Sequence, residues 1–413
     1  MATETTGRRV VIVGAGYAGM TAALRLGKRC RKLSAGVTLV NGTDTFVERI
    51  RLHQAGSGQR VKTHSIERML RGTGVAFVQG RVTALQADVR RLTVAQADGG
   101  GLTLDYDTLL YALGSTIDVD SVPGVREQAL ALGSPALAAR LAGELPALAA
   151  RGGRLLVCGG GLTGIEAATE IAEAWPGVRV ALATRERLGE RLSQKGRAHL
   201  HTVFTRLGIA LHEGASVTRL AAGQAELADG GTVPFDLCLW AGSFSVPALA
   251  REAGLRVNGR GQILVGPDLR SLSHPEIVAA GDAAAPAEDP GAPIRMACAT
   301  AMPLGACAAD SILATLEGKP APAFSYRYLF QCISLGRRNG LIQLVNADDS
   351  PREKIVAGRA AALFKEFICR YTTFALGMER RLPGSYRWPQ GKRLPATARP
   401  ASGPAQMDTG AGD

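Results

Sequence analysis

The sequence lacks paired cysteines. Its seven cysteines include no C-x-x-C or C-x4-C pair, and their number is odd. Structural zinc sites and disulfide frameworks both use cysteines at short, regular spacings. The spacing therefore argues against a zinc site and predicts reduced thiols, so we expect no bound metal.

Charge clusters and long apolar runs are also absent. Charged residues make up only 20% of the chain, and its net charge of +12 comes without the lysine-arginine runs of a nucleic-acid surface, so we expect no nucleic-acid partner. The N-terminal segment MATETTGRR has no signal-peptide core, and the longest apolar runs fall short of a membrane span. These absences predict a globular, cytoplasmic protein.

Glycine, by contrast, is abundant. The segment VVIVGAGYAGMTAAL joins a buried strand to a helix, and Gly14, Gly16 and Gly19 occupy the positions of a G-x-G-x-x-G fingerprint around Ala15. These glycines permit a tight turn, backbone approach to a pyrophosphate and close helix packing, while the helix N-terminus faces the phosphates. Asn41 ends the next strand, where such sites carry a ribose-binding carboxylate. We expect a dinucleotide here, with the Asn41 amide on its ribose.

A second glycine turn follows in VCGGGLTGIEAATE, where Gly159, Gly161 and Gly164 repeat the spacing. The end of the next strand carries Thr184 and Arg185 instead of the acidic residue of an NAD site. Arginine there favours the 2′-phosphate of NADPH, unless it is simply solvated. The second turn therefore predicts NAD(P)H binding, with NADPH favoured over NADH.

Together these motifs resemble the two-dinucleotide-binding-domain flavoproteins with the glutathione-reductase-like fold. The resemblance also includes the strand-glycine junctions at Gly114 and Gly242 and the segment IVAAGDAA. The segments GGGLTGIEAATE and LWAGSF are most similar to type II NADH dehydrogenases and their quinone-reductase relatives, within the pyridine nucleotide-disulfide oxidoreductase family. The resemblance covers residues 8 to 315.

The resemblance implies an α/β fold with two Rossmann-like dinucleotide-binding domains and a C-terminal α+β segment. It assigns FAD to the first site and NAD(P)H to the second, with Glu166 beside the nicotinamide as the residue that positions it over the flavin. The expected boundaries are 1–120 and 246–323 for the two parts of the FAD-binding domain, 121–245 for the NAD(P)H-binding domain, 324–390 for a segment facing a partner or a membrane, and 391–413 for a disordered tail.

The cofactor contacts implied by the resemblance fall into two sets. FAD would be held through its pyrophosphate, adenine and ribityl regions by Gly14, Gly16, Gly19, the backbone around Val82, Gly281 and Asp282. NAD(P)H would be held by Gly159, Gly161 and Gly164.

Two departures from the family pattern bear on the electron acceptor. The segment TDTFVERIRLHQAG lacks the cysteine pair of disulfide reductases, and RMACATAMPLGAC replaces the glutamine-bearing motif of type II NADH dehydrogenases. We therefore expect an FAD-dependent NAD(P)H dehydrogenase that reduces a quinone-like or other small acceptor. The alternatives are a tailoring flavoenzyme of specialised metabolism and a nucleotide-sensing flavoprotein without turnover.

The segment 358–382 is predicted to be an amphipathic helix. Arg359, Lys365, Arg370, Arg380 and Arg381 would face anionic headgroups, with Phe364, Phe367, Phe374 and Leu376 below them. A packing or homodimer helix is the alternative. The segment therefore leaves open peripheral contact with the inner face of a membrane.

Overall fold

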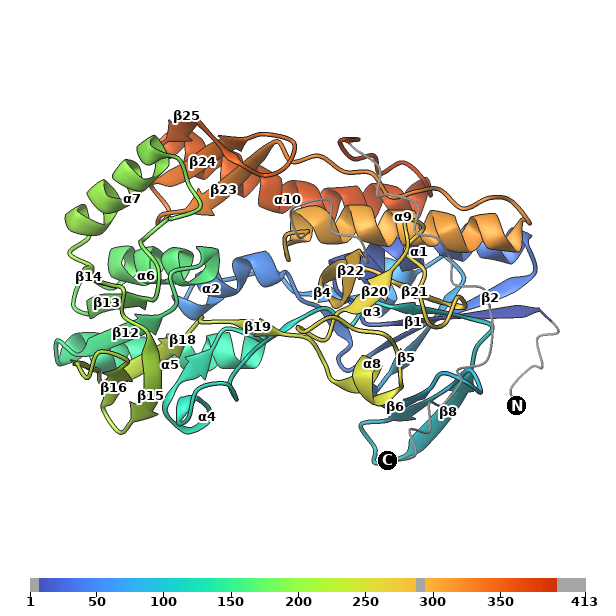
Figure 1. The fold of residues 1–413 in the computed structure, drawn as a ribbon, viewed down its shortest axis with the longest axis horizontal. Helices are drawn as coiled ribbons and strands as arrows, with labels where there is room; N and C mark the ends of the chain where they lie inside the picture. The colour runs from blue at the N-terminus through green and yellow to red at the C-terminus, as the bar shows by residue number, and fades with distance from the viewer. Residues whose placement is uncertain (1–6, 287–293, 392–413) are drawn as a thin grey trace, which may run out of the picture.

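The computed structural model describes residues 7–286 and 294–391 and has two parallel sheets (Figure 1). The first sheet has the strand order β21-β9-β1-β2-β5. The apolar run VVIV explains why β1 is central, since a strand covered on both faces is continuously apolar. The bounds are β1 Arg8–Val13, β2 Ala35–Asn41, β5 Val75–Gln79, β9 Thr108–Tyr111 and β21 Ile277–Ala279.

The second sheet repeats this plan, with the strand order β11-β18-β12-β13-β14 and parallel pairing throughout. Both glycine turns lie at the carboxyl ends of central strands, where open α/β sheets bind their ligands. The two sheets confirm the predicted fold class. The bounds are β11 Leu130–Ala131, β12 Arg154–Cys158, β13 Arg179–Thr184, β14 Ala210–Glu213 and β18 Leu237–Trp240.

Each glycine turn leads into a helix, α1 (Tyr17–Lys32) or α6 (Leu162–Ala174). Helix α1 packs on α9 (Cys298–Leu316) so closely that a Cβ at Gly305 would lie 2.1 Å from Ala18 O. Helix α9 is long and apolar enough to cross a membrane, but 78% of its apolar window is buried inside the protein, as in a core helix.

Two small antiparallel sheets and several short elements complete these units. The small sheets contain β6 Arg81–Gln86, β7 Arg91–Ala95 and β8 Gly101–Asp105, and β15 Val217–Ala221, β16 Gln224–Leu227 and β17 Thr232–Pro234. The other elements are β3 Thr45–Phe46, η1 Arg49–Arg51, α2 Leu52–Gly56, β4 His64–Ser65, α3 Ile66–Leu70, β10 Thr116–Ile117, α4 Val125–Gln128, α5 Pro135–Ala150, α7 Gln194–Arg206, β19 Phe244–Ser245, α8 Leu249–Glu252, β20 Ile263–Val265, η2 Gly281–Ala283 and β22 Ala284–Pro286.

The C-terminal segment contacts both units (Figure 1). Its antiparallel sheet packs against α6 and α7, while its helix α10 packs against α1. The Glu353 carboxylate accepts hydrogen bonds from Gln194 N and Lys195 N at 2.8 and 3.2 Å, at the N-terminus of α7. The C-terminal segment therefore bridges the helices that flank the first and second parallel sheets. Its elements are β23 Phe330–Ser334, β24 Gly340–Val345, β25 Pro351–Ala357 and α10 Arg359–Arg381.

Helix α10 is amphipathic, as predicted, but two of its residues lie elsewhere than expected. Lys365 is only 14% exposed and pairs with Glu166 rather than pointing to headgroups, and Leu376 is fully buried. Lys365 turns inward because a buried carboxylate is available to pair with it. The expected tail, 391–413, lies outside the described residues apart from Gly391.

Candidate functional site

A single cavity of about 2020 Å³ joins the two glycine turns and extends to the C-terminal segment. Its lining includes Gly14 and Gly16 from the first turn, Gly159 and Gly161 from the second, and Lys365 from α10. Pockets for a single ligand usually measure about 300–1,000 Å³. The cavity is therefore large enough for two dinucleotides and a further small molecule.

The first turn has the geometry of a pyrophosphate cradle. Gly14 adopts a φ of +96°, and a Cβ at Gly19 would lie 1.8 Å from Gly14 O, so neither tolerates a side chain. A Cβ at Gly16 would meet no described atom within 4 Å, and no described side chain caps helix α1 there. The first N–H groups of α1 are thus available to an anion.

Asn41 lies at the end of β2 beside this turn and lines the cavity. Its Oδ1 accepts a hydrogen bond from Ala15 N at 2.9 Å, and its Nδ2 donates to Thr43 O at 2.9 Å. The side chain is therefore held against the turn, where a ribose would approach.

The structure brings Gly114, Gly281 and Asp282 to the same cavity. Gly114 and Gly281 both have positive φ angles, +68° and +74°. Asp282 accepts a hydrogen bond from Ser115 Oγ at 2.7 Å, and burial raises the pKa of its carboxyl group. Val82, by contrast, is not among the described residues that line the cavity; it lies in β6 and packs on the hydrophobic core.

The second turn reproduces the first. Gly159 has a φ of +122°, and a Cβ at Gly164 would lie 1.9 Å from Gly159 O. A Cβ at Gly161 would meet no described atom within 4 Å, and no described side chain caps α6. Gly242 lines the cavity beside Gly159, and a Cβ at Gly242 would lie 2.8 Å from the Trp240 ring.

Thr184 occupies in the second sheet the place of Asn41 in the first. The register pairs Val13 with Val40 and Cys158 with Ala183. Asn41 and Thr184, the next residues on the second strand of each sheet, therefore lie level with the first glycine of the corresponding turn. Thr184 is buried, whereas the side chain of Arg185 is 78% exposed and lies 3.8 Å from Glu186. Both line the cavity, together with Glu186 and Arg187.

Glu166 is buried on α6 and lines the cavity. Its Oε1 forms an ion pair with Lys365 Nζ and accepts a hydrogen bond from Ser334 N, each at 3.0 Å, and its Oε2 lies 3.6 Å from His53 Nδ1. Burial raises the pKa of Glu166, but Lys365, His53 and the Ser334 N–H outweigh it and leave that pKa below its usual value. The carboxylate is therefore ionised at neutral pH.

The sequence predicts a role for Glu166 but does not identify two of its partners, Lys365 and Ser334. The only signal for Lys365 is a lysine among apolar residues in ALFKEF, and an exposed lysine on an amphipathic helix looks the same. Ser334 contributes its backbone N–H, which leaves no trace in the sequence.

The third part of the cavity lies between α9, α10 and the C-terminal sheet. Apolar and aromatic side chains dominate its lining: Met296, Tyr326, Phe330, Ile368, Tyr371 and Tyr386. Cys298, Cys332 and Cys369 also line it, and all three are free thiols whose pKa values are raised by burial. This part offers an apolar site with the Lys365 ammonium group at its polar end.

These features fit two dinucleotides. Each turn has an uncapped helix N-terminus, an open middle glycine and a parallel-strand edge, as pyrophosphate binding requires. Within the described residues, no cluster of three or more His, Cys, Asp or Glu side chains could hold a metal ion.

Comparisons with known proteins agree with this geometry. The chain is 28% identical over 355 residues to an NADH dehydrogenase-like protein of Mycobacterium tuberculosis, covering 79% of this chain and 86% of the relative. It is 26% identical over 372 residues to the demethylphylloquinone reductase of Synechocystis, covering 86% and 92%. The sulfide:quinone oxidoreductase of Aquifex aeolicus superposes with a TM-score of 0.77 at 18% identity, covering 92% and 93%, which shows the fold alone.

The model of one family, pyridine nucleotide-disulphide oxidoreductase, matches residues 8–304. This match includes both glycine turns and the Gly281–Asp282 segment, and it spans well over half of the chain. The protein therefore belongs to the pyridine nucleotide-disulphide oxidoreductase family and is an FAD-dependent oxidoreductase.

Proposed function

We propose that the protein takes hydride from NAD(P)H at the second turn and passes the electrons, through FAD at the first turn, to a quinone in the apolar part of the cavity. The observation that carries this proposal is the one cavity that joins both turns to the C-terminal segment. The relative from Synechocystis reduces a quinone by its name, and the relative from Mycobacterium is NADH dehydrogenase-like.

The first turn would hold FAD through the N–H groups at the start of α1, with Asn41 near a ribose and Gly281 and Asp282 against the ribityl chain. Bound FAD supplies the exchange between hydride and electron transfer, which no side chain can perform. In this proposal Val82 has a packing role, and Glu166 orients the nicotinamide.

The acceptor site combines mainly apolar walls with two cationic side chains among the described residues, Lys365 and Arg295, of which Arg295 is paired with Asp349. The Lys365 ammonium group can donate a hydrogen bond to an oxygen of the electron acceptor. Glu166, which pairs with Lys365, can exchange a proton with the same acceptor. A tailoring flavoenzyme with a specialised substrate remains the alternative, because the glutamine-bearing motif of quinone-reducing relatives is missing from α9.

We further propose that NADPH is the better donor. Thr184 carries no charge to repel a 2′-phosphate, and Arg185 and Arg187 line the cavity beside it. Glu186 also lines this region and would favour the bare ribose of NADH, so the balance between Arg185 and Glu186 sets the preference.

The exposed face of α10 fits the surface of an anionic membrane. The side chains of Leu363, Phe367 and Phe374 are at least 60% exposed, and the helix also carries Arg370 and Arg380. Aromatic residues with flanking arginines are typical of interfacial helices. We therefore propose peripheral contact of a cytoplasmic enzyme with the membrane, with a homodimer as the alternative use of this face.

Anaerobic titration of the flavin-loaded protein with NADPH and then NADH tests the proposed function. We expect stoichiometric loss of the oxidised-flavin absorbance, followed by its recovery on addition of a soluble quinone. Bleaching without recovery by any quinone would favour the tailoring enzyme. Bound flavin that neither nucleotide bleaches would leave a sensing role.

A further inference from the structure

His53 lies on the short helix α2 and has no role in the proposed function. It is only 3% exposed and belongs to the lining of the cavity. Its Nδ1 lies 3.6 Å from Glu166 Oε2, while its Nε2 has no hydrogen-bond partner among the described residues. This arrangement fits a neutral ring whose Nδ1–H points at the carboxylate and whose Nε2 lone pair is open.

Charged groups face His53 from three surrounding elements. Glu166 and Glu170 act on it from α6, Lys365 from α10 and Arg337 from the turn between β23 and β24. Burial lowers the pKa of the ring, the two carboxylates oppose that effect, and the two cations add to it. The ring is therefore neutral at rest, and the two carboxylates on α6 favour its protonated form.

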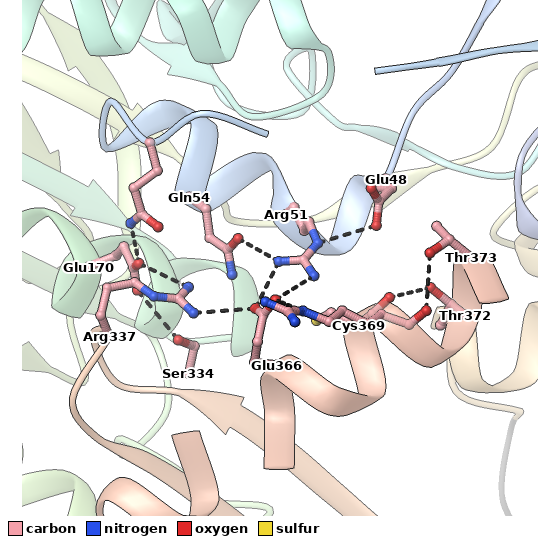
Figure 2. A network of polar contacts seen from close by, with 12 residues as sticks. Glu48, Arg51, Gln54, Glu170, Ser334, Arg337, Glu366, Cys369, Thr372 and Thr373 are labelled. Carbon is pink, nitrogen blue, oxygen red and sulfur yellow. Dashed lines mark hydrogen bonds and ion pairs between the residues drawn. The ribbon is translucent and has the colours of Figure 1, made fainter. Parts of the chain in front are cut away.

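Glu170 is the second carboxylate on this face of α6. It is one turn from Glu166 and only 1% exposed. Its oxygens accept hydrogen bonds from Gln59 Nε2, from Arg337 Nη1 at 3.4 Å and from Ser334 Oγ at 3.4 Å (Figure 2). The Arg337 side chain is 37% exposed, so Glu170 lies next to the protein surface.

Quinone reduction needs a proton from water. The nicotinamide delivers a hydride, which brings two electrons and one proton, whereas a quinone becomes a quinol by gaining two electrons and two protons. One proton per turnover must therefore reach a site that is walled mainly by apolar side chains.

We propose that His53 carries this proton from Glu170 to Glu166. The inference rests on the proposed function, because only a proton-consuming acceptor requires the route. His53 acts through Glu166 and need not touch the acceptor itself.

The transfer leaves the electrons untouched. An Nε2–H bond forms with a proton released by Glu170, the Nδ1–H bond breaks, and Glu166 Oε2 gains that proton for the acceptor. Glu170 regains a proton from water on the Arg337 side, and the ring returns to its Nδ1–H tautomer before the next turnover.

His53→Asn separates proton delivery from packing. Asparagine keeps an N–H donor near the position of Nδ1 but does not titrate in this range. The matched control is His199→Asn, because His199 is half-buried, bonds to Asn339 at 3.1 Å and is not among the residues that line the cavity. Each variant is compared with wild type for flavin reduction by NAD(P)H, for turnover with ferricyanide, which takes electrons without protons, and for turnover with a soluble quinone.

We expect His53→Asn to keep flavin reduction and ferricyanide turnover within about twofold of wild type and to lose at least about tenfold with quinone, with a larger solvent deuterium isotope effect. His199→Asn should match wild type throughout. Unchanged quinone turnover in His53→Asn, or an equal loss with ferricyanide, would overturn the route while leaving the proposed function intact. A wild-type protein that reduces no quinone would overturn both.

A measurement without turnover tests the same inference. In protein with ¹⁵N-labelled histidine, the six ring systems are few enough to assign by substitution. We expect His53 to be neutral at pH 7 with its proton on Nδ1, and Glu170→Gln to shift its resonances. A permanently charged ring, or a proton on Nε2, would contradict the route.

Discussion

Lys365 Nζ lies 3.0 Å from Glu166 Oε1, and this ion pair joins helix α10 of the C-terminal segment to helix α6 of the second glycine turn. The side chains are only 14% and 9% exposed. Removing one member of such a pair leaves the other as an uncompensated buried charge.

Lys365→Met should therefore destabilise the protein. We expect the free energy of unfolding to fall by about 3 kcal/mol, measured by chemical denaturation. Lys354→Met, at an exposed position of β25, is the matched control and should have almost no effect. The double variant Glu166→Gln/Lys365→Met removes the unpaired carboxylate as well. If it is no more stable than Lys365→Met alone, the loss of unfolding free energy does not arise from the unpaired Glu166 carboxylate.

The same pair predicts a pH window for stability. The pKa of Glu166 is lowered, so its contribution is complete above its unfolded pKa of about 4.3 and disappears as the pH falls through the folded value. The pKa of Lys365 is raised, because Glu166 outweighs the effect of burial, so its contribution is complete below about 10.4 and disappears as the pH rises through the folded value. The stability difference between wild type and Lys365→Met should be largest from neutral pH to about pH 10 and should shrink towards acid pH, because burial raises the pKa of the unpaired Glu166 in the variant and the carboxylate is relieved when it takes up a proton. A difference that keeps growing towards acid pH would contradict this assignment.

The sequence was sufficient to predict both glycine turns because each has a purely local cause. The positive φ of Gly14 and Gly159 and the close contacts of Gly19 and Gly164 recur at fixed spacing, and a fixed spacing can be read from one chain. Glu166 could be singled out for its place in the second motif. The Lys365 side chain could not be placed, because its partner lies 199 positions away and only the packing of α10 brings them together.

Arg185→Ala tests the preference for NADPH. We expect the Michaelis constant for NADPH to rise about tenfold, equivalent to about 1.4 kcal/mol of lost binding, and that for NADH to stay unchanged. Glu186→Gln should do the opposite if its carboxylate repels the 2′-phosphate, lowering the constant for NADPH. Steady-state kinetics with both nucleotides decides, and an unchanged NADPH constant in Arg185→Ala would show that this guanidinium group is only solvated.

Replacing Phe367 and Phe374 with serine tests the membrane surface on α10. We expect co-sedimentation with anionic liposomes at low salt to fall at least fivefold, because both rings are at least 60% exposed and would lose their apolar insertion. Val89→Ser, which is 63% exposed but far along the chain from α10, should bind liposomes like wild type. Should the double variant instead change a sedimentation coefficient from dimer to monomer, the face is a homodimer interface.

The middle glycines of the two turns allow each cofactor to be assigned to its site. Gly16 and Gly161 both have a φ of −71°, which alanine adopts without strain, and a Cβ at either would meet no described atom within 4 Å. Alanine should therefore leave the fold intact while its methyl group enters the space where the pyrophosphate approaches.

Gly16→Ala should purify with much less flavin than wild type, whereas Gly161→Ala should retain its flavin but require about tenfold more NAD(P)H for half-maximal bleaching. Gly164→Ala provides the contrast, because its Cβ would lie 1.9 Å from Gly159 O, so this variant should lose stability as well as binding. Flavin absorbance, nucleotide titration and thermal unfolding distinguish the three. Loss of flavin from Gly161→Ala with normal flavin in Gly16→Ala would reverse the assignment of the two sites, because each open glycine reports only on the ligand that approaches it.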